Sequence, residues 1–213
     1  MKNIAVAALL VVTLSACASK TEPSQANFAR GLNAYLEKRG DLCLGKFDWP
    51  IDVTQHESEV GSRNALQMPV LEKLGLASSS EATIEVKSDD EVPVTSTVKA
   101  RRYQLTDAGR KYYVTREFVS QIGGNAVHQG DFCAARLSLD KVVGWELSKS
   151  PDDHQLAAVS YTYKIDPAPW MQNADAQKAF PVVAHMIQSA GTAQLRETFK
   201  LTDKGWIAQD LPR

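Results

Sequence analysis

The sequence predicts an α+β fold made of two tandem related repeats, each with short helices and a small antiparallel sheet. In both halves, apolar residues recur with helical spacing in some segments and alternate with polar residues in others. A set of short matches also recurs in one order: a cysteine at 43 and 133, a proline followed by apolar residues at 69 and 181, and Leu-Thr-Asp-x-Gly at 105–109 and 201–205. Ordered recurrence favours tandem duplication over chance matches, and the mixture of helices and short strands favours α+β over a parallel α/β fold.

The first repeat, residues 28–122, starts inside a helix predicted over 24–39. Phe28, Leu32 and Leu36 lie on one face of that helix, and Gly40 stops it. After it we predict extended chain over 43–53, broken at Trp49-Pro50, and a helix over 63–74 that carries the apolar residues Leu66, Val70, Leu71 and Leu74. A hairpin with strands at 81–87 and 95–105 and a strand over 111–119 follow.

The second repeat, residues 123–213, begins at Gly123-Gly124-Asn125, the best candidate for a boundary. Strict alternation over 159–165 predicts a strand with one dry face. A helix is predicted over 174–189, and renewed alternation predicts a strand over 195–201. In both copies of Leu-Thr-Asp-x-Gly we expect the leucine to reach the core, the threonine or aspartate to cap a short helical turn, and the glycine to turn the chain.

Residues 1–16 have the composition of a secretory signal. Lys2 supplies a positive charge, and the apolar run over 4–14 is too short to cross a bilayer as a stable helix. The run ends in Leu14-Ser15-Ala16-Cys17, which resembles the lipobox of bacterial lipoproteins. The resemblance implies cleavage before Cys17 and a diacylglyceryl group on its sulfur. The alternative is an ordinary secretory signal that contains a cysteine.

The lipoprotein resemblance also implies a place in the cell. Ala18 and Ser19 stand where an inner-membrane retention signal would usually place Asp, so the implied location is the outer membrane, with the protein lipid-anchored and facing the periplasm. Each buried acyl methylene contributes about 0.8 kcal/mol to such an anchor. Residues 17–27 would then be the lipidated cysteine and a polar tether. The mature chain also resembles, through YTYKI, APW and LTDKGW in this order, a type of proteobacterial lipoprotein with no assigned activity.

Charge and cysteine content narrow the possible partners. Removal of the signal leaves 197 residues with 23 basic and 25 acidic side chains, which gives no overall attraction to nucleic acid, and no nucleic-acid partner is expected.

With Cys17 acylated, Cys43 and Cys133 remain, and in an oxidising envelope they either form a disulfide or stay as buried thiols. The bridge would close a loop of about ninety residues. By lowering the entropy of the unfolded chain, it would stabilise the fold by on the order of 4 kcal/mol.

Residues 69–113 resemble part of a nucleic-acid-binding module. VLEKLGLASSS, a charged hairpin and RRYQLTDAGRKYY are similar to the last helix, wing and closing strand of winged-helix proteins. An envelope protein meets no chromosome, so the resemblance implies a winged-helix-like fold without DNA binding. Six basic side chains lie in or just after this stretch: Lys99, Arg101, Arg102, Arg110, Lys111 and Arg116. They form either a patch for an anionic partner or a solvated sheet edge.

The chain contains no His-Glu-x-x-His, no Gly-x-Ser-x-Gly and no Walker-type glycine loop. His56 and His154 each stand beside acidic residues in polar stretches, where a single imidazole favours a solvated loop over a metal site. We predict no catalytic residue, no metal and no cofactor. The predicted function is a nonenzymatic module that binds or assembles an envelope protein, lipid or glycan. The alternatives are an envelope hydrolase or other enzyme with an unrecognised site, and a purely structural surface lipoprotein.

Overall fold

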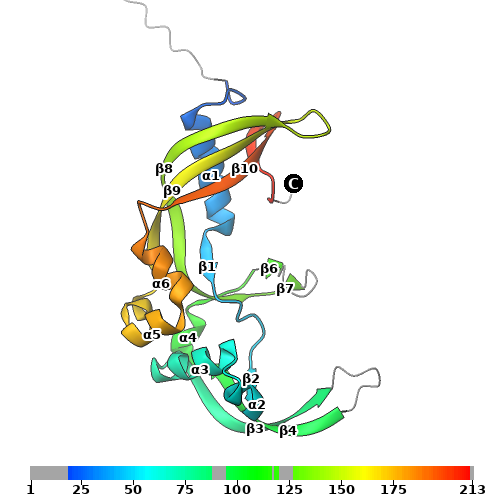
Figure 1. Cartoon of the computed structure of the whole chain (residues 1–213), viewed down its shortest axis with the longest axis vertical. Coiled ribbons are helices and arrows are strands. Elements are labelled where there is room, and N and C mark those ends of the chain that lie inside the picture. The colour runs from blue at the N-terminus through cyan, green and yellow to red at the C-terminus, as the bar shows by residue number, and fades with distance from the viewer. Residues whose placement is uncertain (1–18, 88–94, 117, 120–126, 212–213) are drawn as a thin grey trace, which may run out of the picture.

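The computed structural model describes residues 19–87, 95–116, 118–119 and 127–211 (Figure 1). Helices combine with antiparallel sheets in this part of the chain, so the predicted α+β class is confirmed. The molecule is elongated, with a long helix and a curled sheet at one end and a helical cluster with a smaller sheet at the other (Figure 1). None of the helices in these ranges combines the length and hydrophobicity needed to cross a bilayer.

At one end, a sheet curls around α1 (Gln25–Arg39). The order of its strands is β1 (Asp41–Cys43), β8 (Asp131–Lys149), β9 (Gln155–Pro167), β10 (Gln194–Thr202) and β11 (Gly205–Ala208), with β5 (Tyr113–Val114) also paired to β8. Ser24 begins α1 by accepting a hydrogen bond from the Asn27 N–H. Phe28 and Leu32 are fully buried between α1 and the sheet, and the cluster around them is called the α1 core.

The other end is built on a three-stranded sheet with the order β2 (Ile51–Thr54), β4 (Thr95–Leu105) and β3 (Ala77–Lys87). Two helices, α2 (Gln55–Glu59) and α3 (Arg63–Lys73), connect β2 to β3. Thr54 and Glu57 form a capping box at the start of α2, which satisfies backbone N–H groups that would otherwise lack partners. Met68 and Leu71 of α3 are fully buried, and the cluster around them is called the α3 core.

The segment between β9 and β10 completes the α3 core. It contains η1 (Pro169–Gln172), α5 (Ala174–Ala179) and α6 (Pro181–Gln188), and α5 packs against α3. The helix predicted over 174–189 is therefore divided in two at Phe180. The reason is Pro181, which lacks an N–H and disfavours helical geometry in the residue before it.

Most other predicted elements are confirmed. The structure contains the helices expected over 24–39 and 63–74, both arms of the hairpin, and the strands expected over 159–165 and 195–201. The predicted strand over 111–119 is wrong as a single element. The first residues after α4 (Asp107–Arg110) form a turn, and β5 is followed by a separate strand β6 (Phe118–Val119) paired with β7 (Val127–His128). The predicted boundary at 123–125 lies outside the described residues.

The two copies of Leu-Thr-Asp-x-Gly differ in local structure. In the first copy, Thr106 caps α4 by accepting a bond from the Gly109 N–H, so the predicted cap is present. In the second copy, Thr202 ends β10 and Gly205, at φ +105°, begins β11 after a tight turn. The predicted glycine turn is present there, and the helical cap is replaced by a hairpin.

Both cores combine elements from both sides of residues 122 and 123. The early elements α1 and β1 pack on and pair with the late strand β8, and α3 packs on α5. The tandem-repeat relation and the winged-helix-like module stay predictions.

Candidate functional site

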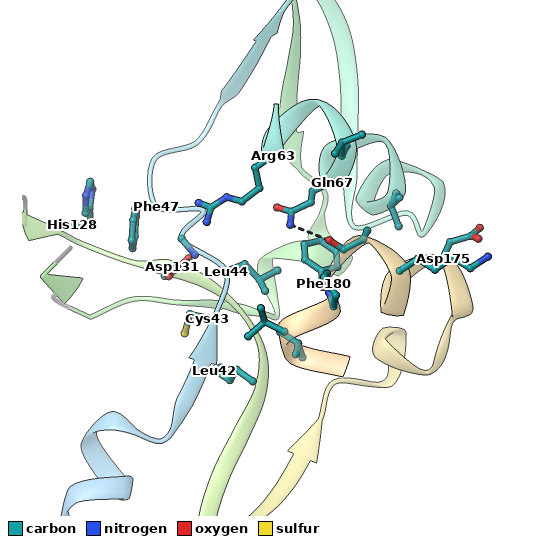
Figure 2. A pocket seen from close by; sticks show the side chains of 18 residues that line it. Leu42, Cys43, Leu44, Phe47, Arg63, Gln67, His128, Asp131, Asp175 and Phe180 are labelled. Carbon is teal, nitrogen blue, oxygen red and sulfur yellow. Dashed lines mark hydrogen bonds between the residues drawn. The ribbon is translucent and has the colours of Figure 1, made fainter. Parts of the chain in front are cut away.

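A cleft of about 1180 Å³ opens beside the α3 core. Its walls are α3 on one side, α5 and α6 on another, and the chain that follows β1 on a third (Figure 2). This volume lies slightly above the range of about 300–1,000 Å³ that is usual for ligand pockets. This volume and its largely apolar lining make the cleft our candidate binding site.

The wall formed by α5 and α6 depends on the break at Pro181. The break ends α5 at Ala179 and directs Phe180 and Val183 into the α3 core, where they are 3% and 4% exposed. Val182 follows Pro181 on the outer side of α6 and is 70% exposed. One wall of the cleft therefore has an apolar floor and an apolar rim.

The wall formed by α3 has the same character. Leu71 is fully buried on the core side of the helix, Val70 is half-buried in the cleft, and Leu66 is 63% exposed at its rim. The apolar stripe of α3 is wider than the surface that the small sheet and η1 to α6 cover, so its outer edge stays uncovered.

The exposed apolar rim of the cleft costs the unbound protein part of its possible burial free energy. Full burial of a leucine or valine side chain contributes about 1.5–3 kcal/mol, and Leu66 and Val182 leave most of that gain unused. Grouped apolar side chains around a hollow typically mark an interaction site.

Gln67 adds a polar group to the cleft lining. Its Nε2 donates to the Ala179 carbonyl at 3.0 Å and so ties α3 to α5 (Figure 2). Its Oε1 is buried and has no hydrogen-bond partner among the described residues. A buried acceptor without a partner costs about 1–3 kcal/mol, which a donor on a bound ligand would recover after a small movement of the side chain.

The charged side chains that line the cleft are the carboxylates of Asp131 and Asp175 and the cations of Arg63 and Lys178. Asp175 pairs with Lys73 at 2.7 Å, and both carboxylate oxygens of Asp131 accept backbone N–H groups. Arg63 and Lys178 also line the cleft, and neither forms an ion pair with a described residue. The cleft is thus apolar with two available cations.

A buried polar cluster supports the wall that follows β1. Lys46 is 1% exposed, and its Nζ donates to Asn64 Oδ1 at 2.7 Å, while its backbone N–H donates to Asp131 at 2.7 Å. Burial, with a smaller contribution from nearby Arg63, lowers the pKa of Lys46 to about 8, and Asp131 partly opposes the shift. Burial also raises the pKa of Asp131, against hydrogen bonds from the backbone of Lys46, Gly45 and Phe132. The cluster holds the loop after β1 against α3.

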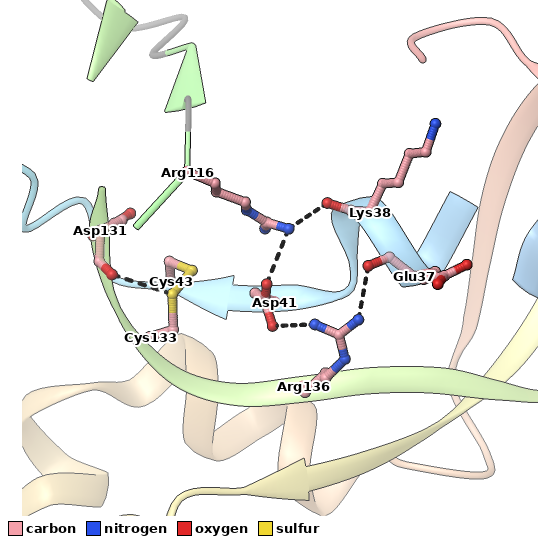
Figure 3. Close-up of polar contacts among 8 residues, drawn as sticks. All are labelled: Glu37, Lys38, Asp41, Cys43, Arg116, Asp131, Cys133 and Arg136. Carbon is pink, nitrogen blue, oxygen red and sulfur yellow. Dashed lines mark hydrogen bonds and ion pairs between the residues drawn. A yellow bond between two sulfur atoms is a disulfide. The ribbon is translucent and has the colours of Figure 1, made fainter. Parts of the chain in front are cut away.

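The predicted disulfide is confirmed: Cys43 of β1 is bonded to Cys133 of β8, and the two residues face each other across the strand pair. Asp41, two residues earlier, accepts from Arg116 at 3.0 Å and from Arg136 at 2.6 Å (Figure 3). Asp41 directly follows Gly40, the C-cap of α1, and Cys43 lines the cleft. The disulfide and this ion-pair cluster therefore fix the short segment between the end of α1 and the cleft.

The structure does not bring the six basic residues of the predicted patch together. Arg101 and Arg102 are consecutive in β4 and therefore point to opposite faces of the sheet, where they pair with Glu72 and Asp52 respectively. Arg110 pairs with Asp107.

Of the other three members, Lys99 lies on the same face of β4 as Arg101 and lines the same small hollow, whereas Lys111 and Arg116 come from other segments. Lys99 lies in β4, Lys111 follows α4, and Arg116 belongs to the Asp41 cluster. Four of the six therefore have acidic partners within the fold.

The remaining candidates lie apart from the cleft or outside the described residues. The lipobox-like tetrad lies outside the described residues: Leu14, Ser15, Ala16 and Cys17. His56 lies in α2 and His154 after the turn between β8 and β9. Across the described ranges, His, Cys, Asp and Glu side chains do not gather in groups of three that could hold a metal ion.

Sequence reasoning missed the roles of Gln67, Lys46 and Asp131. Phe180-Pro181 gave a usable signal, since a proline inside an apolar helical pattern predicts the break that forms one wall. Comparison of the chain with protein-family models, with curated proteins and with solved structures finds no match in any of the three.

Proposed function

We propose that the protein is a lipid-anchored outer-membrane protein that acts as a nonenzymatic binding module, and that its cleft holds an apolar, acidic segment of an envelope protein. The observation that carries the proposal is the cleft itself, with Leu66 and Val182 exposed on facing rims. A bound segment would bury both side chains and gain the free energy that the unbound protein leaves unused.

The chemistry of the lining favours a protein segment over an acyl chain or a glycan. Gln67 offers an unsatisfied acceptor, and a peptide backbone carries N–H donors that an acyl chain lacks. The apolar rims favour side chains over sugar hydroxyls. Arg63 and Lys178 favour a segment that carries a carboxylate.

Two observations support the envelope location. The tetrad ending at Cys17 resembles a lipobox. The bond between Cys43 and Cys133 suits an oxidising compartment, and structural disulfides are rare in the cytosol.

We also infer that residues 69–113 belong to a winged-helix-like module, together with the preceding β2, α2 and start of α3, and that this module serves as one wall of the cleft. The order β2, α2, α3, β3, β4, with β2 paired to the outer side of β4, supports this inference. In the proposed module α3 presents Leu66 and Val70 to a protein segment, and two basic side chains of β4, Arg101 and Arg102, are paired with Glu72 and Asp52.

The test is site-specific photocrosslinking in intact cells. A photoreactive amino acid in place of Leu66 should capture a discrete envelope protein. Val60 is the matched control position, because it is 62% exposed on the end of α2 and does not line the cleft. Equal capture from both positions, or none from Leu66, would refute the proposed site.

A further inference from the structure

The chain next to the proposed anchor is bound to the folded body. Asn27, in the first turn of α1 and 5% exposed, donates from Nδ2 to the carbonyls of Ser19 and Glu22, both at 2.8 Å. The indole N–H of Trp206 in β11 donates to the same Glu22 carbonyl at 3.3 Å. Residues 19–24, here called the collar, are thus fixed on the end of α1, although their polar composition predicted a free tether.

Covalent geometry limits how far the collar can stand from an acylated Cys17. Only Ala18 lies between Cys17 and Ser19. Two residues of extended chain span about 7 Å at most. The headgroup layer on one side of a bilayer is about as thick, roughly 5–7 Å. A lipid on Cys17 would therefore bring the collar to the headgroup surface.

Two exposed apolar side chains of β8 lie at the same end. Trp145 is 38% exposed and packs on Phe28 with ring centroids 5.0 Å apart, and Phe28 is equally close to Trp206. Leu147 is 57% exposed and lies on the same face of β8, two residues nearer to the β8–β9 turn. Because Trp206 also binds the collar, Trp145 and Leu147 are near the start of the described chain.

The formal charges of the described residues at this end give no positive excess: the collar and the β10–β11 turn are each neutral, and the β8–β9 turn carries Lys149 with Asp152 and Asp153. The collar carries Lys20 and Glu22, and the neighbouring β10–β11 turn carries Asp203 and Lys204. Attraction to anionic lipid therefore contributes little, and the exposed Trp145 ring is of the type that favours the membrane interface.

We propose that the collar end of the protein lies on the bilayer, with Trp145 and Leu147 in the interfacial layer and the cleft facing away from the membrane. This inference rests on the proposed acylation of Cys17. The 15 residues of α1 rise about 22 Å, and α3, α5 and α6 lie beyond the far end of α1 (Figure 1). The partner segment would then reach the cleft from the periplasm and not from the headgroup layer.

The experiment uses the full lipidated protein in phosphatidylcholine vesicles. An environment-sensitive fluorophore is attached to Leu147→Cys and, as the matched site in the cleft, to Leu66→Cys. Spin-labelled phosphatidylcholine with the label near the interface should quench the Leu147 probe several-fold more than the Leu66 probe. Aqueous iodide should show the opposite order, and added anionic lipid should change neither result.

The possible results distinguish failure of the proposed anchor from failure of the proposed orientation. Intact mass first establishes whether Cys17 carries acyl chains, and their absence would overturn both the anchor and the orientation. Equal lipid quenching at the two sites of an acylated protein would overturn the orientation alone. A Leu147 probe that is shielded from iodide but not quenched by lipid would assign the surface to a second copy of the chain, which would also overturn the inference.

Discussion

The two cores of this protein differ in how completely they cover their apolar side chains. In the α1 core one long helix is enclosed by a curled sheet, and Phe28, Leu32 and Phe199 are fully buried. The α3 core is assembled from several short helices and a small sheet, and it leaves Leu66 and Val182 uncovered at the rim of a cleft.

The contrast separates residues that stabilise the fold from residues that are free to bind a partner. A continuous helix against a continuous sheet can bury its whole apolar face. Short elements that meet at angles leave gaps between them, and here the gap is lined by apolar side chains and two available cations. We therefore expect substitutions in the α1 core to act on folding and substitutions at the cleft rim to act on binding.

The largest expected effect is in the α1 core. Phe28→Ala should lower the free energy of unfolding by about 3–5 kcal/mol, because it removes a fully buried aromatic ring and leaves a cavity. Leu66→Ala, at the cleft rim, should change it by less than about 0.5 kcal/mol. Urea unfolding of the two variants measures this contrast. A comparable loss in both would mean that Leu66 belongs to a core.

The next effect concerns the disulfide between β1 and β8. Replacing Cys43 and Cys133 by alanine should lower the free energy of unfolding by about 2–4 kcal/mol, because the unfolded chain loses a cross-link over 90 residues. Reduction of the wild-type protein should give the same loss, measured by urea unfolding with and without reductant. Reductant should leave the double variant unchanged, and an unchanged wild-type midpoint would refute a structural role for the bond.

The pH dependence of stability should differ between the cores. The pKa of Lys46 is lowered to about 8 from 10.5 by burial, so the unfolded state binds more protons in that window. The free energy of unfolding should rise, by on the order of 2 kcal/mol, as pH increases from about 8 towards 10.5. The cost of the buried charge is fully present below pH 8. Lys46→Met should abolish the rise, and a rise that persists in this variant would contradict the assignment.

The α1 core should show the opposite sign. Burial, together with Glu197 and Asp210, raises the pKa of Tyr161 from 10.0 to about 12. The folded state then binds more protons between these values, so this contribution to stability is complete below pH 10 and is lost towards pH 12. The two slopes can be read from one series of unfolding curves across the alkaline range. Tyr161→Phe is expected to lessen the decline, to which the raised pKa values of Tyr35 and Tyr163 also contribute.

Regular elements were predictable because their apolar spacing is local. The helix over 24–39 and the strand over 159–165 have clear periods, and the disulfide followed from there being two cysteines besides Cys17. The 19 residues of β8 were not predicted as one strand. Its alternation is interrupted by charged residues and by register shifts at 139–141 and 142–144, which a strict period of two does not allow.

The cleft could not be predicted because its walls come from segments about a hundred residues apart. Spacing placed Leu66 on the same helical stripe as Val70 and Leu74, but spacing does not show how much of a stripe the neighbouring elements cover. The same limit applies to Leu-Thr-Asp-x-Gly. A Cβ on Gly109 would meet the Leu76 carbonyl at 1.9 Å, whereas Gly205 is needed for its φ of +105°. The same motif therefore needs its glycine for close packing in one copy and for backbone conformation in the other.

The most direct test of the division between a folding core and a binding cleft uses a photocrosslinker at Val182, on the rim opposite Leu66. Adduct yield per folded molecule is measured in cells that carry the additional substitution Leu66→Asp or, as the control, Val60→Asp. We expect Leu66→Asp to abolish the adduct while the urea midpoint stays at the wild-type value, and Val60→Asp to retain both the adduct and the midpoint. An adduct that survives Leu66→Asp, or that both substitutions remove equally, would contradict that division.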